Sequence, residues 1–198
     1  MPEVPPELTG HPDRLRWNAR YEGDSPSFEP HPLAMRALAL PLPDGPVADL
    51  ACGASGSALL AAAAGRQVTA VDVSELALGL LAREAGRRGL GSLITVVQAD
   101  LWTWAPEPGS YALVLCTGYW DQAVFGTAAG AVAAGGALAW QAFTADARRA
   151  RPGLCRDWCL DPGQPASLLP ADFDVLDEHD LPDHQRGTMR LLLAQRRG

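Results

Sequence analysis

Lysine is absent from the 198-residue chain, so all sixteen basic residues are arginine. Acidic residues outnumber them at 23 to 16, which gives a formal net charge of -7 at pH 7. A protein that binds the phosphates of nucleic acid needs a basic face. The negative net charge therefore argues against a nucleic-acid partner. We attribute the missing lysine, together with abundant alanine and glycine, to coding bias.

Targeting signals and long apolar segments are also missing. The first ten residues have neither a basic stretch nor an apolar core, so we predict a cytoplasmic protein without a secretory signal. Residues 123–143 carry no charge and approach the length of a membrane span, which is about 20 residues. Gly135 and Gly136 interrupt this stretch, which favours a buried helix followed by a buried strand and predicts no membrane partner. The four cysteines are unevenly spaced and predict no disulfide framework.

The composition fits one soluble domain. Hydrophobic residues make up 47% of the chain and charged residues 20%, so we treat residues 1–198 as a single domain. We divide it into an N-terminal lid or leader (1–45), a cofactor-binding core (46–143) and a substrate-side segment with edge strands (144–198). The predicted strands are residues 47–51, 67–71, 93–97, 111–116, 137–143, 173–179 and 188–195, and helices are expected from about residue 57 and over 74–89.

This alternation predicts an α/β fold. Continuous apolar strands separated by helices indicate a Rossmann-like, doubly wound, mostly parallel seven-stranded sheet with helices on both faces. The last two predicted strands leave too few residues between them for a crossover helix. We therefore expect them to pair with each other at one edge of the sheet and to supply an antiparallel edge strand.

Small residues follow the first predicted strand, where such sheets bind ligands. Gly53 and its small neighbours let a ligand approach the backbone, and the helix from about Ser57 points free N–H groups toward it. Asp72 ends the second predicted strand, where a carboxylate can accept both hydroxyls of a ribose. Asp49 would oppose the pyrophosphate of a dinucleotide, but it suits the ammonium and sulfonium groups of S-adenosylmethionine.

Three stretches carry a resemblance to a known family. DLACG (49–53) and VTAVD (68–72) resemble motifs I and II of the class I S-adenosylmethionine-dependent methyltransferases, of the small bacterial, methyltransferase-domain type. VVQAD, which ends at Asp100, is similar to the third-strand motif whose acid faces the adenine amino group. The resemblance implies S-adenosylmethionine as cofactor and S-adenosylhomocysteine as product. The cofactor-binding residues that it implies in the core are Asp49, Ala51, Cys52, Gly53, Ser55, Ser57, Asp72, Val73, Asp100, Leu101, Cys116 and Thr117.

Two residues depart from the family pattern, and two other functions stay open. Ser55 stands where a second glycine is usual and is expected to crowd the methionine portion, and Ala112 stands where an aspartate is common. The alternatives are an NAD-dependent Rossmann oxidoreductase, against which Asp49 argues, and a noncatalytic S-adenosylmethionine-binding module. Taken singly, Asp49 and Asp72 also fit the role of helix-capping acids.

The residues after the fourth predicted strand are the candidates for the acceptor side. CTGYWD (116–121) lacks the motif of enzymes that methylate DNA amino groups, and we expect a small-molecule acceptor. Tyr119 and Asp121 are the catalytic candidates, although Asp121 also fits a helix cap. A sulfonium is a good leaving group, so positioning and exclusion of water can supply much of the catalysis, and no general base is identified. The oligomeric state is left open.

Cysteines, histidines and clustered arginines give weaker hypotheses. Cys116 fits inert packing better than a nucleophile. A zinc site drawn from the cysteines and histidines near the end of the chain has an unusual first spacing, and no metal is predicted. An arginine-rich run fits a solvated face better than an anion site. The zinc set is Cys155, Cys159, His179 and His184, and the arginines are Arg148, Arg149, Arg151 and Arg156.

An aromatic and basic pattern precedes the sheet. Trp17, Arg20 and Tyr21 are spaced i, i+3 and i+4, so they share one face of a helix. This W-x-x-R-Y pattern resembles an element that closes over the cofactor in similar small methyltransferases. The resemblance implies a lid in which Arg20 pairs with the methionine carboxylate while the two rings exclude water. The alternative is that both rings pack on the core and Arg20 faces solvent.

Overall fold

A computed structural model describes residues 4–23, 25–183, 185 and 187–198 of the chain. The strands are β1 (Val47–Leu50), β2 (Val68–Asp72), β3 (Ile94–Gln98), β4 (Tyr111–Thr117), β5 (Val132–Thr144), β6 (Cys159–Leu160), β7 (Phe173–Leu181) and β8 (Met189–Arg196). The α-helices are α1 (Pro12–Tyr21), α2 (Pro32–Leu38), α3 (Gly56–Ala63), α4 (Glu75–Arg87), α5 (Gln122–Ala131) and α6 (Ala147–Ala150). Short 3-10 helices are η1 (Pro6–Leu8), η2 (Arg156–Trp158) and η3 (Ala166–Leu168).

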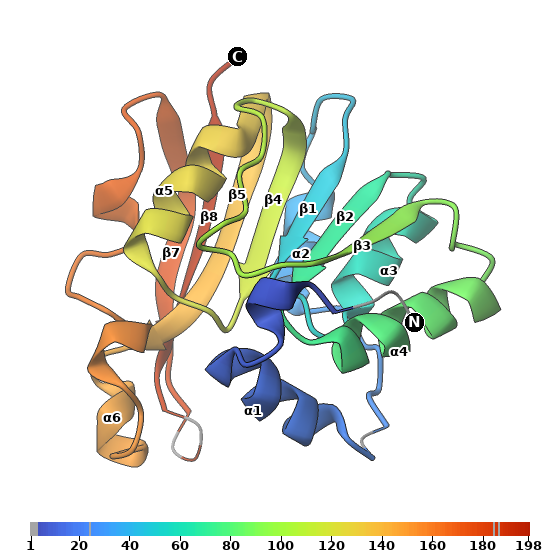
Figure 1. The fold of residues 1–198 in the computed structure, drawn as a ribbon. Helices are drawn as coiled ribbons and strands as arrows, with labels where there is room; N and C mark the ends of the chain where they lie inside the picture. The colour runs from blue at the N-terminus through green and yellow to red at the C-terminus, as the bar shows by residue number, and fades with distance from the viewer. Residues whose placement is uncertain (1–3, 24, 184, 186) are drawn as a thin grey trace.

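All of these strands belong to one sheet (Figure 1). The order is β3-β2-β1-β4-β5-β8-β7, and the short strand β6 pairs with β5. Neighbouring strands from β3 to β5 run parallel, whereas β8 is antiparallel to both β5 and β7. The predicted Rossmann-like sheet with an antiparallel pair at one edge is therefore confirmed. Strand β6 was not predicted, because two apolar residues are too few to carry a periodic pattern.

Each face of the sheet has its own apolar core. Val114 and Cys116 of β4 belong to the core under α5, while Leu113 and Leu115 belong to the core under α2, α3 and α4. Side chains alternate between the faces along a strand, so one apolar strand serves both cores. In Figure 1, α5 lies in front of β4 and β5, and α2 lies behind the sheet. The prediction of helices on both faces is confirmed.

The predicted helix and strand positions are confirmed to within a few residues, except at the start of β5. This strand begins at Val132, so the glycine pair lies inside the strand and does not separate it from α5. A Cβ atom on Gly136 would lie 2.8 Å from the carbonyl oxygen of Ala112, and this close strand contact explains the glycine. Within the described ranges, the helices include none that is both long and apolar enough for a membrane span.

An aromatic cluster supports the segment after β4. Trp140 is fully buried, and its ring packs edge-on against Phe125 and Trp120, with centroids 5.2 and 6.4 Å away. The Trp140 indole Nε1 also donates to the carbonyl oxygen of Tyr119 at 3.0 Å. A buried indole usually finds such a partner, and here the bond fixes the backbone at Tyr119.

Candidate cofactor and acceptor site

The carboxyl ends of four parallel strands meet at one edge of the sheet, and α1 lies across this edge (Figure 1). The chain order reverses between β1 and β4, and open α/β sheets bind ligands in the crevice at such a point. Asp49 lies in β1, Asp72 ends β2 and Asp100 follows β3. The fold therefore brings these predicted acids to neighbouring strand ends.

The Asp72 carboxylate is tied to the loop after β1. Its Oδ2 accepts the N–H of Gly53 at 2.8 Å, and its Oδ1 accepts the N–H of Ser74 at 2.8 Å. Burial raises the pKa of Asp72, and the hydrogen bonds from Ser74 and Gly53 oppose this shift without cancelling it. Gly53 has φ of +58° and Ala51 has φ of +47°, both in the left-handed region. Glycine adopts this conformation easily, whereas alanine there is strained, which the sequence did not signal.

Asp49 is buried beside this loop, with only 2% of its surface exposed. The hydroxyl of Ser55 donates to Asp49 Oδ2 at 2.5 Å and accepts the N–H of Ala58 at 2.9 Å, which caps α3. We expected Ser55 to crowd the methionine portion of the cofactor. Its hydroxyl is instead directed toward Asp49 and the first turn of α3. Burial raises the pKa of Asp49 to about 7, and the nearby Asp72 carboxylate also contributes to the increase.

The two cysteines near the loop behave as packing residues. Cys116 is fully buried, and burial, followed by the charge of Asp49, raises the pKa of both the Cys116 and the Cys52 thiols. A thiol held in its neutral form is a poor nucleophile. The Cys52 N–H donates to the carbonyl oxygen of Val71 at 3.1 Å and so anchors the loop to β2.

Three other predicted residues lie in different surroundings. The Ser57 hydroxyl accepts the N–H of His31 at 3.0 Å, so it is directed at the segment before α2. The carbonyl oxygen of Val73 accepts Nε2 of Gln98 at 3.1 Å. Leu101 is 6% exposed and packs in the core under α5. The hydroxyl of Ser57 is therefore engaged by His31 and does not bond to the Asp49 or Asp72 carboxylate.

Asp100 meets the N-terminal segment. Its Oδ2 lies 3.4 Å from Nε2 of His11, and its Oδ1 accepts the N–H of Trp102 at 3.1 Å. Two buried side-chain atoms, His11 Nδ1 and Gln98 Oε1, have no hydrogen-bond partner within the described part of the chain. Buried polar atoms are rarely left unpaired, so both atoms are available to a water molecule or a ligand at this edge. Sequence reasoning missed both residues.

Helix α1 places only one of its three predicted residues on the loop. A Cβ atom on Gly53 would overlap the Tyr21 hydroxyl, which shows how closely Tyr21 covers this glycine. The Trp17 ring lies 6.5 Å from that of Tyr21 but is 41% exposed, and Arg20 is exposed. The inward face of α1 instead carries Arg14, Asn18 and Tyr21, spaced i, i+4 and i+7, a helical pattern that sequence reasoning overlooked.

The acceptor-side candidates have distinct roles. The Tyr119 phenol is partly buried; burial raises its pKa, and the charges of Asp121 and Asp100 raise it further, so it is neutral at pH 7. Asp121 Oδ1 accepts the N–H groups of Ala123 at 2.9 Å and Val124 at 3.0 Å. Asp121 is therefore the N-cap of α5, as its alternative role predicted. Thr117 ends β4 two residues before Tyr119.

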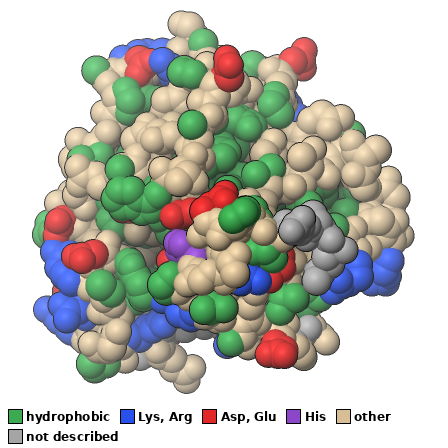
Figure 2. Space-filling model, viewed as in Figure 1, with side chains coloured by type: hydrophobic (Ala, Val, Ile, Leu, Met, Phe, Trp, Pro, Cys, Tyr) green, Lys and Arg blue, Asp and Glu red, His purple; other side chains and the backbone are tan. Residues whose placement is uncertain are grey.

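The residues considered for zinc and anion binding lie at the surface or pair elsewhere. The Cys159 thiol donates to the Cys155 carbonyl oxygen at 3.4 Å, His179 Nδ1 is 2.9 Å from Asp177, and His184 lies outside the described residues. Within those residues, no three His, Cys, Asp or Glu side chains are grouped as a metal would require. The clustered arginines are all exposed, and arginine side chains gather at the lower left of the face in Figure 2. The exposed arginines are Arg148, Arg149, Arg151 and Arg156.

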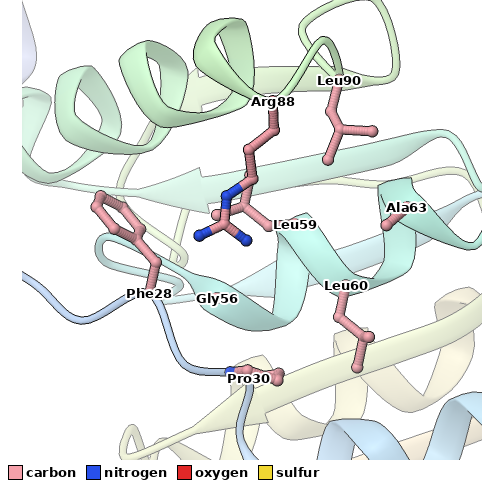
Figure 3. Close-up of a pocket in the computed structure, with 8 residues that line it drawn as sticks. All are labelled: Phe28, Pro30, Gly56, Leu59, Leu60, Ala63, Arg88 and Leu90. Carbon is pink, nitrogen blue, oxygen red and sulfur yellow. The ribbon is translucent and has the colours of Figure 1, made fainter.

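A hollow of about 290 Å³ opens between α3, α4 and the segment before α2 (Figure 3). Its lining is mostly apolar, with Phe28 and Leu59 on its walls, and the Arg88 guanidinium projects into it. Arg88 Nε donates to Glu84 at 2.7 Å, so its charge is already paired. None of the predicted site residues lines this hollow, and it is separate from the strand ends.

Comparisons with known proteins agree with this fold. Residues 47–136 match a family model described as a methyltransferase domain. The comparison with curated proteins gives no match. Magnesium protoporphyrin IX methyltransferase from Synechocystis PCC 6803, solved with bound S-adenosylhomocysteine, is 18% identical, with a TM-score of 0.66 and 93% of each chain covered.

Two further solved structures share the fold. Geranyl diphosphate C-methyltransferase from Streptomyces coelicolor A3(2) is 13% identical, with a TM-score of 0.63, 99% of this chain covered and 88% of the other. The [4+2]-cyclase SpnF is 18% identical, with a TM-score of 0.64, 83% of this chain covered and 78% of the other. At these identities the matches show the fold, while the family match covers the strands and loops that carry the acids. Residues 47–136 are therefore the core of a class I S-adenosylmethionine-dependent methyltransferase domain.

Proposed function

We propose that the protein transfers a methyl group from S-adenosylmethionine to a small-molecule acceptor beside Tyr119. The observation that carries this proposal is the loop at Gly53, whose N–H binds the buried Asp72 carboxylate next to the buried Asp49. Two buried acids around a loop without bulky side chains suit a cationic nucleoside without phosphates. When bound, S-adenosylmethionine supplies a methyl group on a sulfonium, which is a good leaving group.

Each part of the cofactor has residues that suit it. Asp72 would accept the ribose hydroxyls, and Asp100 would accept the adenine amino group near Val73 and Leu101. Asp49 and Gly53 would face the methionine portion, where a carboxylate favours the ammonium group. Tyr21 supports the lid role of α1, because it already lies against Gly53.

Among the described residues, no side chain near Tyr119 is arranged as a strong base. The Tyr119 phenol keeps its proton at neutral pH because its pKa is raised. We therefore propose that Tyr119 orients the acceptor through its hydroxyl, and that positioning and exclusion of water supply most of the rate.

A small acceptor is supported by charge and by relatives. The net charge of -7 does not favour nucleic acid. The two methyltransferases described above are named for magnesium protoporphyrin IX and geranyl diphosphate, both small molecules, and each aligns with more than nine-tenths of this chain. A [4+2]-cyclase with the same fold keeps a second candidate open, a module that binds the cofactor without methyl transfer.

Titration calorimetry with S-adenosylhomocysteine and with NAD⁺ tests the proposal. We expect S-adenosylhomocysteine to bind and NAD⁺ to give no heat, because the pyrophosphate would meet Asp49. Binding of NAD⁺ alone would favour the oxidoreductase instead. A panel of small acceptors with methyl-labelled cofactor then separates turnover from binding alone.

A further inference from the structure

Helix α1 is fastened to the start of α4 by one carboxylate. Arg14 Nε donates to Glu75 Oε2 at 2.8 Å, and Arg14 Nη2 donates to Glu75 Oε1 in a second, short bond. Asn18 Nδ2 donates to Oε1 at 2.9 Å, and Gln98 Nε2 donates to Oε2 at 3.1 Å. Each oxygen of Glu75 thus accepts two donors, and the donors come from α1 and from β3.

This network is shielded from water. The Arg14 side chain is 13% exposed and that of Glu75 is 11% exposed. Burial alone would raise the pKa of Glu75, but hydrogen bonds from Arg14 and Asn18 outweigh it and hold the pKa below its usual range. Glu75 is therefore ionised at neutral pH, and its position in the first turn of α4 favours that charge. A bidentate, shielded arginine–carboxylate pair is much stronger than an exposed one.

The same network continues to the residues proposed for the ribose. The Ser74 hydroxyl donates to Asn18 Oδ1 at 2.7 Å, and the Ser74 N–H donates to Asp72. The other Asp72 oxygen accepts the N–H of Gly53, and Gly53 lies under Tyr21 at the far end of α1. Helix α1 thus spans the site from Glu75 to Gly53 and meets it at both ends.

We propose that Glu75 is a positioning residue that holds α1 over the cofactor loop and thereby slows cofactor release. The inference rests on the proposed cofactor site. Tyr21 lies on Gly53 and Asn18 on Ser74, so α1 must move before a nucleoside enters or leaves between them. Arg14, Asn18 and Glu75, and not the exposed Arg20, form the attachment.

The experiment follows the release of S-adenosylhomocysteine by stopped flow in matched variants. Glu75→Gln keeps the size of the side chain and removes its charge, and it should raise the dissociation rate about tenfold. Glu84→Gln is the control, because Glu84 is an equally buried acid of α4 whose partners, Arg87 and Arg88, lie on the same helix. We expect Glu84→Gln to leave the rate unchanged. The double variant Arg14→Glu, Glu75→Arg should recover part of the loss through the reversed pair.

Trypsin cleavage gives a second readout, and the comparison between variants does not require the cofactor. Arg14, Arg16 and Arg20 place cleavage sites in α1, and Glu75→Gln should make them more sensitive, while S-adenosylhomocysteine restores protection. Equal effects of Glu75→Gln and Glu84→Gln would reduce the role to stability of α4 and overturn the proposal. Unchanged release and unchanged cleavage would also overturn it. If Glu75→Gln folds poorly, Asn18→Ala tests the same attachment.

The two proposals fail in different ways. If the wild-type protein does not bind S-adenosylhomocysteine, the cofactor site is wrong, and the trypsin comparison still decides whether Glu75 fastens α1. If binding is normal and only the Glu75 variants behave like wild type, the cofactor site stands and the attachment is wrong.

Discussion

Aspartates serve opposite purposes at two regions of the sheet, the strand ends near α1 and the edge strand β7. At the strand ends, Asp49 and Asp72 are buried and receive donors from Ser55 and from backbone N–H groups. On β7, exposed Asp174 and Asp180 pair with arginines of the C-terminal segment. Charges on an edge strand discourage pairing with another sheet. Burial and the kind of donor, and not the number of acids, therefore mark the site.

The largest expected effect concerns the pH dependence of stability at Asp49. Its pKa in the folded protein is about 7, whereas an unfolded aspartate has a pKa of about 3.9. Between these values the folded state binds more protons, so the free energy of unfolding falls as pH rises from about 4 to about 7. We expect Asp49→Asn to remove this decrease and to stabilise the free protein at pH 8 by up to about 4 kcal/mol. Urea unfolding at pH 5 and pH 8 measures it.

The control for this prediction is Asp174→Asn, an exposed acid on β7. It should change the two unfolding energies by less than about 0.5 kcal/mol. If the free energy of unfolding changes equally with pH in wild type and in Asp49→Asn, Asp49 is solvated like the acids of the edge strand. The proposed difference between the two regions would then be wrong.

The next effect concerns cofactor affinity at Asp72. Asp72→Ala should weaken S-adenosylhomocysteine binding about tenfold or more, because the ribose hydroxyls lose their acceptors. Asp180→Ala, at the opposite edge, should leave the affinity unchanged. Calorimetry on both variants sharpens the contrast between the regions, and an unchanged affinity for Asp72→Ala would remove the ribose assignment.

A smaller effect tests the capping role of Asp121. Asp121→Ala should lower the free energy of unfolding by about 1 kcal/mol, since the first N–H groups of α5 lose their acceptor. Asp121→Asn retains a capping oxygen and should lower the free energy of unfolding by only about 0.3 kcal/mol. Thermal melts measure both. If the two variants lose equal stability, the negative charge of Asp121 at the N-terminus of α5, and not its capping oxygen, supplies most of the stabilisation.

The smallest effect is expected at the pair between Arg190 and Asp180. Arg190 Nε and Nη2 donate to the two Asp180 oxygens at 2.6 and 3.1 Å, and the side chains of Arg190 and Asp180 are 21% and 44% exposed. Exposed pairs contribute about 0.2–1 kcal/mol, and salt screens them. Asp180→Ala should therefore shift the urea midpoint slightly at low salt and not at 1 M salt. A large, salt-independent loss would contradict the division between the two regions.

The sequence predicted most of the fold because apolar runs and small-residue turns are local signals. It predicted Asp49, Asp72 and Asp100 at neighbouring strand ends, since position along a strand decides where a side chain lies. In α1 the aromatic pattern predicted Trp17, Arg20 and Tyr21, and of these Tyr21 lies against Gly53 while Trp17 and Arg20 are exposed. Glu75 joins residues that are about 60 positions apart, and no local pattern carries such a contact. Gln98 and His11 were missed for the same reason.

The order of the sheet has a consequence for synthesis of the chain. Strand β8 follows β7 in sequence but lies between β5 and β7, and it pairs with β5 from Ala137 to Phe143. On the ribosome, β5 is complete about 50 residues before β8, an interval of roughly 3–10 s at about 5–20 residues per second. During those seconds the unpaired N–H and C=O groups of β5 lie beside apolar side chains. Until β8 is made, this side of β5 resembles an exposed edge strand, which invites pairing with another chain.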